Sequence, residues 1–135
     1  MALSAIALEI FSAIGINTEL IKAPPRTSSL REIFGSVVIA PLSETWLLGL
    51  TLSLFAKMTP RPLVTATAAA FLWGVLHGLV GWLWFFGTVW SFFIFSCAFI
   101  AWRKHSYQQA FIAAAIPHAL INLSVMLSIA TEKIA

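Results

Sequence analysis

The chain has 135 residues, of which 60% are hydrophobic and only 10% are charged, and its mean hydropathy is +0.93. Soluble domains average about 25% charged residues, and a soluble domain of this size cannot hide so much apolar surface. The composition therefore excludes a water-soluble protein and predicts a single domain that is integral to a membrane. The net charge is +3, but the basic residues do not form a stripe, so nucleic-acid binding is not expected.

Residues 1–30 are predicted to form an N-terminal segment that is separate from the membrane core. The stretch "ALSAIALEIFSAIGI" is apolar but short, and it carries Glu9. We expect an amphipathic helix at the membrane interface, with a fifth span as the weaker alternative. The stretch "KAPPRTSS", residues 22–29, is typical of a linker.

Residues 31–130 contain four apolar segments that are long enough for transmembrane helices, which need about 20 residues each. The first covers 33–56 and ends at "KMTPRP", whose prolines and charges mark a loop. Residues 63–102 contain no Asp, Glu, Lys or Arg, which leaves room for two spans and a turn near "HGLVGW". The fourth covers 107–129. The sequence therefore predicts an all-α bundle of about four transmembrane helices.

The basic residues leave the orientation of this bundle open. The positive-inside rule compares the Lys and Arg counts on the two sides of the membrane, and here the counts are equal. One side carries Lys22, Arg26, Arg31 and Lys133, and the other carries Lys57, Arg61, Arg103 and Lys104.

The candidate ionisable side chains inside the predicted spans are Glu44 in the first, His77 in the second and His118 in the fourth, and Asn122 joins them one turn after His118. An ionisable group in a span is costly unless it has a partner or water, so each is a candidate functional residue. At 1.5 Å per residue, all four lie in a band about 10 Å deep. Because groups at one depth on different helices can meet in the bundle interior, we expect these residues to form one site.

These residues suit two kinds of chemistry. A carboxylate and an imidazole can activate water, while a second imidazole and an amide stabilise an oxyanion. Alternatively, Glu44, His77 and His118 are a ligand set that zinc uses. A proton path is a third interpretation, which four spans without an inverted repeat disfavour. Trp46 and Trp73 flank the site and are candidates for binding a substrate.

In chain order, "APLSETWLLG", "FLWGVLHG" and "IPHALINL" resemble the three motifs of the CPBP family. These are the CAAX-protease and bacteriocin-processing (Abi) membrane proteins, which include the type II CAAX prenyl endopeptidases. Glu44 stands at the first Glu of the family's Glu-Glu-x-x-x-Arg motif. Trp73 and His77 match its Phe/Trp-x-x-x-His motif. His118 and Asn122 match its His-x-x-x-Asn motif.

The resemblance implies an intramembrane endopeptidase of the glutamate type. Glu44 and His77 would activate water, and His118 and Asn122 would form the oxyanion hole. It further implies a peptide or prenylated-peptide substrate and a multi-pass protein of a prokaryotic plasma membrane. No cofactor is expected, although a divalent metal such as zinc is the alternative.

Two positions depart from the first motif, because Thr45 replaces its second Glu and Gly49 replaces its Arg. A buried ion pair can be lost as a unit at little cost, so activity is compatible with this change. The departure also supports an alternative, a catalytically degenerate scaffold or immunity-type protein. Since family members usually have more than four spans, we expect a homo-oligomer or a partner membrane protein to complete the bundle.

Overall fold

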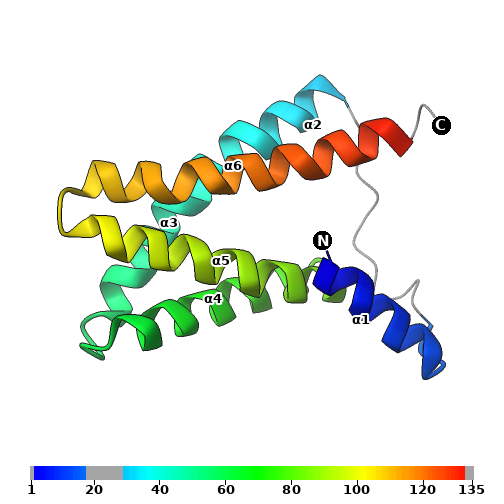
Figure 1. Ribbon diagram of the computed structural model, residues 1–135, viewed down its shortest axis with the longest axis horizontal. Coiled ribbons are helices and arrows are strands. Elements are labelled where there is room, and N and C mark those ends of the chain that lie inside the picture. The colour runs from blue at the N-terminus through cyan, green and yellow to red at the C-terminus, as the bar shows by residue number, and fades with distance from the viewer. Residues whose placement is uncertain (1, 18–28, 133–135) are drawn as a thin grey trace.

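The fold is described from a computed structural model, in which residues 2–17 and 29–132 are described. All regular structure in these residues is helical (Figure 1), which confirms the predicted all-α bundle. The predicted linker falls outside the described residues except for its last residue, Ser29. The elements are α1 (Ala2–Ala13), α2 (Leu30–Phe34), the π-helical turn η2 (Gly35–Ile39), α3 (Ala40–Phe55), α4 (Pro62–Gly78), α5 (Trp82–Arg103) and α6 (Tyr107–Glu132).

Helix ends follow the local signals in the sequence. The Ser29 side chain caps α2 by accepting a hydrogen bond from the Glu32 backbone N–H at 3.3 Å. Pro62 opens α4, where a missing N–H costs nothing. The predicted turn between the second and third spans is confirmed, because α4 ends at Gly78 and α5 begins at Trp82.

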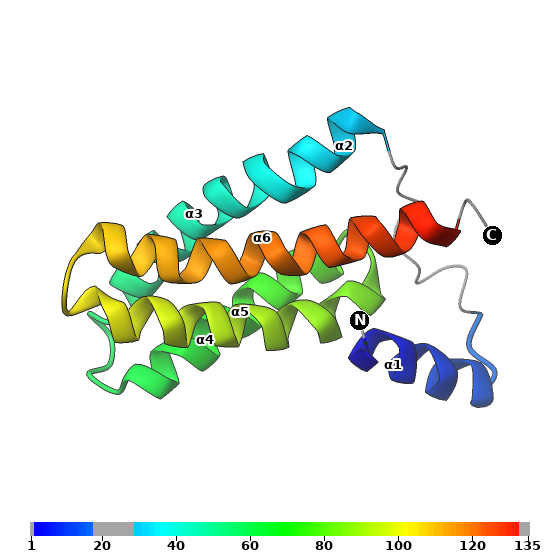
Figure 2. The ribbon, with the colours of Figure 1, turned by 45° about the horizontal axis from the view of Figure 1, so that its top comes forward.

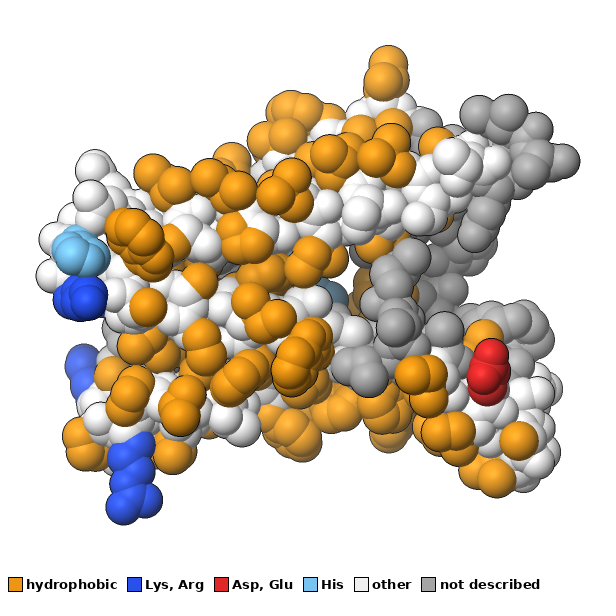
Figure 3. Space-filling view, viewed as in Figure 1, with side chains coloured by type: hydrophobic (Ala, Val, Ile, Leu, Met, Phe, Trp, Pro, Cys, Tyr) orange, Lys and Arg blue, Asp and Glu red, His pale blue; other side chains and the backbone are white. Residues whose placement is uncertain are grey.

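Within the described residues, three helices are long and apolar enough to cross a membrane: Leu30–Phe55, which joins α2, η2 and α3, Trp82–Arg103 and Tyr107–Thr131. The fourth predicted span, α4, is also an apolar helix but has only 17 residues. Apolar side chains cover much of the face of the bundle that is seen in Figure 3. Length and composition thus support a multi-pass membrane protein.

Helix α5 is the centre of the bundle and packs against α1, α4 and α6. In Figure 2, α4, α5 and α6 run side by side in that order, while the long helix of α2, η2 and α3 crosses α6 at an angle. The core joins three phenylalanines of α5 to small residues of α4 and α6 and to two leucines of α3. These core residues are Phe92, Phe95, Phe99, Ala69, Ala70, Ala110, Ala114, Leu48 and Leu52.

A π-helical turn interrupts the first span at Gly35–Ile39. Here the Ala40 N–H bonds to the carbonyl of Gly35, five residues back. Pro41 explains the widened turn, because in a regular helix its ring collides with the carbonyl four residues back. One extra residue in a turn rotates all following side chains by about 100°. The turn therefore decides which way Glu44, five residues after its end, faces.

Candidate active site

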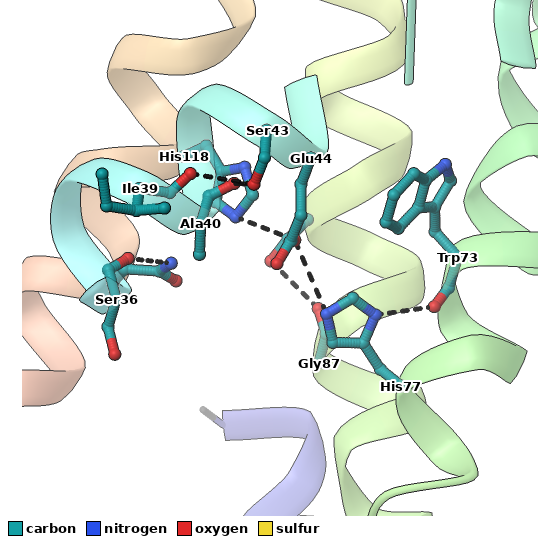
Figure 4. Close-up of polar contacts among 11 residues, drawn as sticks. Ser36, Ile39, Ala40, Ser43, Glu44, Trp73, His77, Gly87 and His118 are labelled. Atoms are coloured by element: carbon teal, nitrogen blue, oxygen red, sulfur yellow. Dashed lines mark hydrogen bonds and ion pairs between the residues drawn. The ribbon is translucent and has the colours of Figure 1, made fainter. Parts of the chain in front are cut away.

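Three helices bring Glu44, His77 and His118 to one point (Figure 4). Nε2 of His77, on α4, lies 3.6 Å from Oε2 of Glu44, on α3. Nε2 of His118, on α6, lies 3.6 Å from the same oxygen. The predicted convergence of these three residues is confirmed. Their catalytic role stays a prediction.

The His77 ring is oriented by its own helix. Nδ1 lies 2.9 Å from the carbonyl oxygen of Trp73, and because a carbonyl only accepts, Nδ1 must carry a hydrogen. In the neutral ring Nε2 is therefore a bare acceptor, and it faces a carboxylate oxygen. Two facing acceptors need a shared proton or a water molecule that donates to both. A water molecule between Nε2 of His77 and the Glu44 carboxylate oxygen would donate a hydrogen bond to each and would be polarised by both.

The His118 ring is buried and fixed by aromatic packing. It stacks on Phe95 with a centroid distance of 4.7 Å and meets Phe92 edge-on at 5.4 Å. Among the described residues its Nδ1 has no hydrogen-bond partner. An orphaned lone pair is easier to bury than an orphaned N–H, so the hydrogen belongs on Nε2, facing Glu44. His118 is therefore a donor where His77 is an acceptor.

The site is open on the side of His77. The side chains of Glu44 and His77 are 23% and 24% exposed, whereas that of His118 is 6% exposed. A small molecule can therefore reach the carboxylate from one side, while the other side is closed by the core.

Asn122 lies on α6 one turn after His118, but its amide is engaged elsewhere. Nδ2 donates to the carbonyl oxygen of Ser36, in the π-helical turn, at 2.8 Å (Figure 4). The structure therefore joins Asn122 to the helix that carries Glu44 and not to the Glu44 side chain. Its predicted contribution to an oxyanion hole stays a prediction.

The two tryptophans proposed for substrate binding differ in position. Trp73 is buried, stacks on Phe92 at 4.7 Å and lies 6.1 Å from the His77 ring. Trp46 is 53% exposed, because two residues along a helix rotate a side chain by about 200° from Glu44. Trp73 is part of the wall of the site, and Trp46 lies on the outer face of α3.

Aromatic side chains fill the space around Gly49, the position of the motif's Arg. A Cβ there would lie 2.8 Å from Cζ of Phe99 and 2.8 Å from Oη of Tyr107. Thr45, at the position of the second Glu, is fully buried, and its hydroxyl has no hydrogen-bond partner among the described residues. The structure therefore leaves no room for the family's Glu–Arg pair.

Zinc is the alternative ligand for these three side chains. Ligand atoms of one tetrahedral zinc ion lie about 2 Å from the metal and so about 3.3 Å from one another, and each Nε2 here lies 3.6 Å from Oε2 of Glu44. Within residues 2–17 and 29–132, no group of three or more His, Cys, Asp or Glu is placed to hold a metal. Zinc binding by Glu44, His77 and His118 stays an untested alternative.

No family model, curated protein or solved structure matches this chain. The functional interpretation therefore rests on the three motifs and on the geometry of their residues.

Proposed function

We propose that this chain is an intramembrane endopeptidase of the CPBP type, which cleaves a peptide bond with a water activated by Glu44 and His77. One observation carries the proposal. His77 and His118, on two different helices, direct Nε2 at the same oxygen of Glu44 on a third helix. This carboxylate oxygen therefore faces a donor in His118 and an acceptor in His77 at once.

The spacing suits a bound water. The two 3.6 Å separations exceed a direct hydrogen bond of about 2.7–3.2 Å, so neither contact is closed. A water that donates one hydrogen to Oε2 of Glu44 and the other to Nε2 of His77 keeps its lone pairs free. That lone pair attacks the peptide carbonyl carbon, and the water's proton passes to the Glu44 carboxylate.

His118 stabilises the tetrahedral intermediate. When Glu44 takes the proton, its charge is lost, and the N–H of His118 becomes available to the new oxyanion. The apolar rings around His118 strengthen that interaction because they exclude water. Glu44 then passes its proton to the leaving nitrogen as the C–N bond breaks. Asn122 is not required in this scheme.

The apolar exterior of the bundle favours a substrate that approaches within the bilayer. We propose a peptide or a prenylated peptide as the substrate, and a prokaryotic plasma membrane as the location. A second copy of the chain or a partner membrane protein would complete the bundle.

The test is cleavage of internally quenched peptides, with and without a prenylated cysteine, by the purified chain in lipid vesicles. Glu44→Gln keeps the shape of the side chain but cannot accept a proton, so cleavage should fall by at least about 100-fold. Glu9→Gln is the matched control, because Glu9 lies exposed on α1, and its activity should equal that of the unaltered chain. Full activity of Glu44→Gln would contradict the proposal.

A second candidate is a non-catalytic scaffold or immunity-type protein. The aromatic filling around Gly49 and the unpartnered Thr45 hydroxyl favour it, because they replace a charged pair of the family motif. This candidate predicts that the unaltered chain cleaves none of the peptides. It also predicts that Glu44→Gln binds or protects as well as the unaltered chain does.

A further inference from the structure

The carbonyl oxygen of Ser36 has no donor within its own helix. In a regular α-helix that donor is the N–H of Ala40, four residues on. Here Ala40 instead bonds to Gly35. In a π-helix the donor is the N–H of residue 41, and Pro41 has none. The proline that induces the wide turn therefore also leaves one carbonyl of that turn unpaired.

The Asn122 side chain supplies the missing donor. Its Nδ2 lies 2.8 Å from the Ser36 oxygen, a contact between residues 86 positions apart in the chain. An unpaired backbone group is costly in the apolar interior of a membrane bundle, so this bond favours the π-helical turn over alternatives. An amide at position 122 is suited to the task, because it donates without carrying a charge.

Helix α6 thus holds the first span at two places, on either side of Pro41. Asn122 bonds to the backbone of Ser36, before the proline. His118, one turn away on α6, lies against the carboxylate of Glu44, after the proline. Because the turn sets the direction of all side chains after it, the bond at Ser36 and the direction of Glu44 are linked.

We propose that Asn122 is a positioning residue, whose amide replaces the backbone N–H that Pro41 lacks and so holds the turn that directs Glu44 at His77 and His118. The proposal about structure stands independently of catalysis. Only its consequence for cleavage rests on the proposed function.

The first experiment measures whether Glu44 still meets the histidines. Solid-state NMR on the chain in lipid vesicles, with isotope-labelled Glu and His, detects the contact between the carboxyl carbon and the ring nitrogens. Glu44→Gln identifies the signal. Asn122→Leu keeps the size of the side chain but has no donor, and we expect the contact to be lost. Ser124→Ala is the control, because the Ser124 hydroxyl bonds only within α6, to Ile121, and the contact should persist. A contact that survives in Asn122→Leu overturns the proposal.

The second experiment tests the link to Pro41 by thermal unfolding in detergent. Asn122→Leu should lower Tm by about 5 °C when Pro41 is present. In a Pro41→Ala background the same change should cost at most half as much. In that background a regular helix lets Ala40 donate to Ser36, and a π-helix lets the new residue 41 donate. Ser36 is therefore paired in both cases. An equal loss in the two backgrounds overturns the proposal.

Cleavage assays separate positioning from a direct role on the substrate. If Asn122 acts through Glu44, then Asn122→Leu loses cleavage and the Glu44–His contact together. Lost cleavage with an intact contact would make Asn122 an oxyanion donor and overturn the proposal. If the unaltered chain cleaves nothing, the proposed function fails, while the NMR and unfolding results still decide the role of Asn122.

Discussion

His77 and His118 meet the same carboxylate oxygen, but their surroundings give the two rings opposite properties. His77 is partly exposed, and a backbone carbonyl takes its Nδ1 hydrogen, so Nε2 faces Glu44 as an acceptor. His118 is buried among Phe92 and Phe95, and its Nε2 faces Glu44 as a donor. A single residue type thereby presents both an acceptor and a donor to the same carboxylate oxygen.

This difference predicts opposite effects of His118→Phe on activity and stability. The new ring fits between Phe92 and Phe95 and removes the buried Nδ1, which has no partner in the part of the chain that the structure describes, so Tm should be unchanged or higher. Cleavage should fall by about 100-fold, because the oxyanion loses its donor. Parallel peptide-cleavage and thermal-unfolding assays provide the check. A large drop in Tm would show that His118 serves the fold.

For single residues, the sequence predicts that Glu44, His77 and His118 meet, but it does not predict the partner of Asn122. Depth along a helix is fixed by its rise per residue, so counting positions was enough to bring Glu44, His77 and His118 together. Asn122 could not be assigned in this way. Its partner is a backbone carbonyl that becomes available only because Pro41 changes a hydrogen-bond pattern 86 positions away from Asn122.

Among the elements, α4 and α5 are held together by small residues. Ala66, Ala70 and Gly74 follow one another at four-residue intervals on α4 and are buried, so one helix face is nearly flat. A Cβ added at Gly74 would overlap Cγ2 of Val89 on α5. The Val89 side chain therefore occupies the space that any side chain larger than hydrogen would need at position 74. The contact fixes the end of α4, where His77 lies.

We therefore expect Gly74→Ala to destabilise the bundle by about 1–3 kcal/mol, the usual cost of overpacking. Val89 cannot easily turn aside, because β-branched side chains are stiff at χ1. Adding Val89→Ala should restore most of the loss. Gly35→Ala is the control, since a Cβ there meets nothing within 4 Å. Equilibrium unfolding in detergent measures these differences, and a neutral Gly74→Ala would refute the close contact.

The boundaries of the elements were largely readable from the sequence, whereas the π-helical turn was not. Proline and glycine mark the connections after α3 and after α4, because each acts on the backbone locally. Pro41 lies inside an apolar run with the same composition on both sides. Such a proline can kink, break or widen a helix, and contacts with α6 decide among these outcomes.

At the scale of the whole molecule, basic residues gather at one end of the bundle (Figure 3). The α3–α4 connection carries Lys57 and Arg61. The α5–α6 connection carries Lys104 and His105 and comes directly after Arg103, the last residue of α5. The fold places these two connections at the same end, and the α4–α5 turn at the other (Figure 1). The helices therefore cross the bundle in alternating directions, as four spans require.

This arrangement predicts the labelling of single cysteines by a membrane-impermeant maleimide in sealed vesicles. In a Cys97→Ala background, Met58→Cys and His105→Cys should react from the same side. Leu79→Cys, in the exposed α4–α5 turn, should react only from the opposite side. Labelling of Leu79→Cys from the side of Met58→Cys would show that the 17-residue α4 does not cross the membrane.

The crowding around Gly49 also limits the evolutionary routes open to this chain. Any side chain at this position must displace the ring of Phe99 or the hydroxyl of Tyr107, so Arg is not tolerated there as a single substitution. A new Glu at position 45 would arrive before its partner and place a lone charge in the core, which is strongly destabilising. Either single substitution is therefore less stable than the present chain. A Glu–Arg pair and the present apolar packing cannot be exchanged one residue at a time without passing through a destabilised protein.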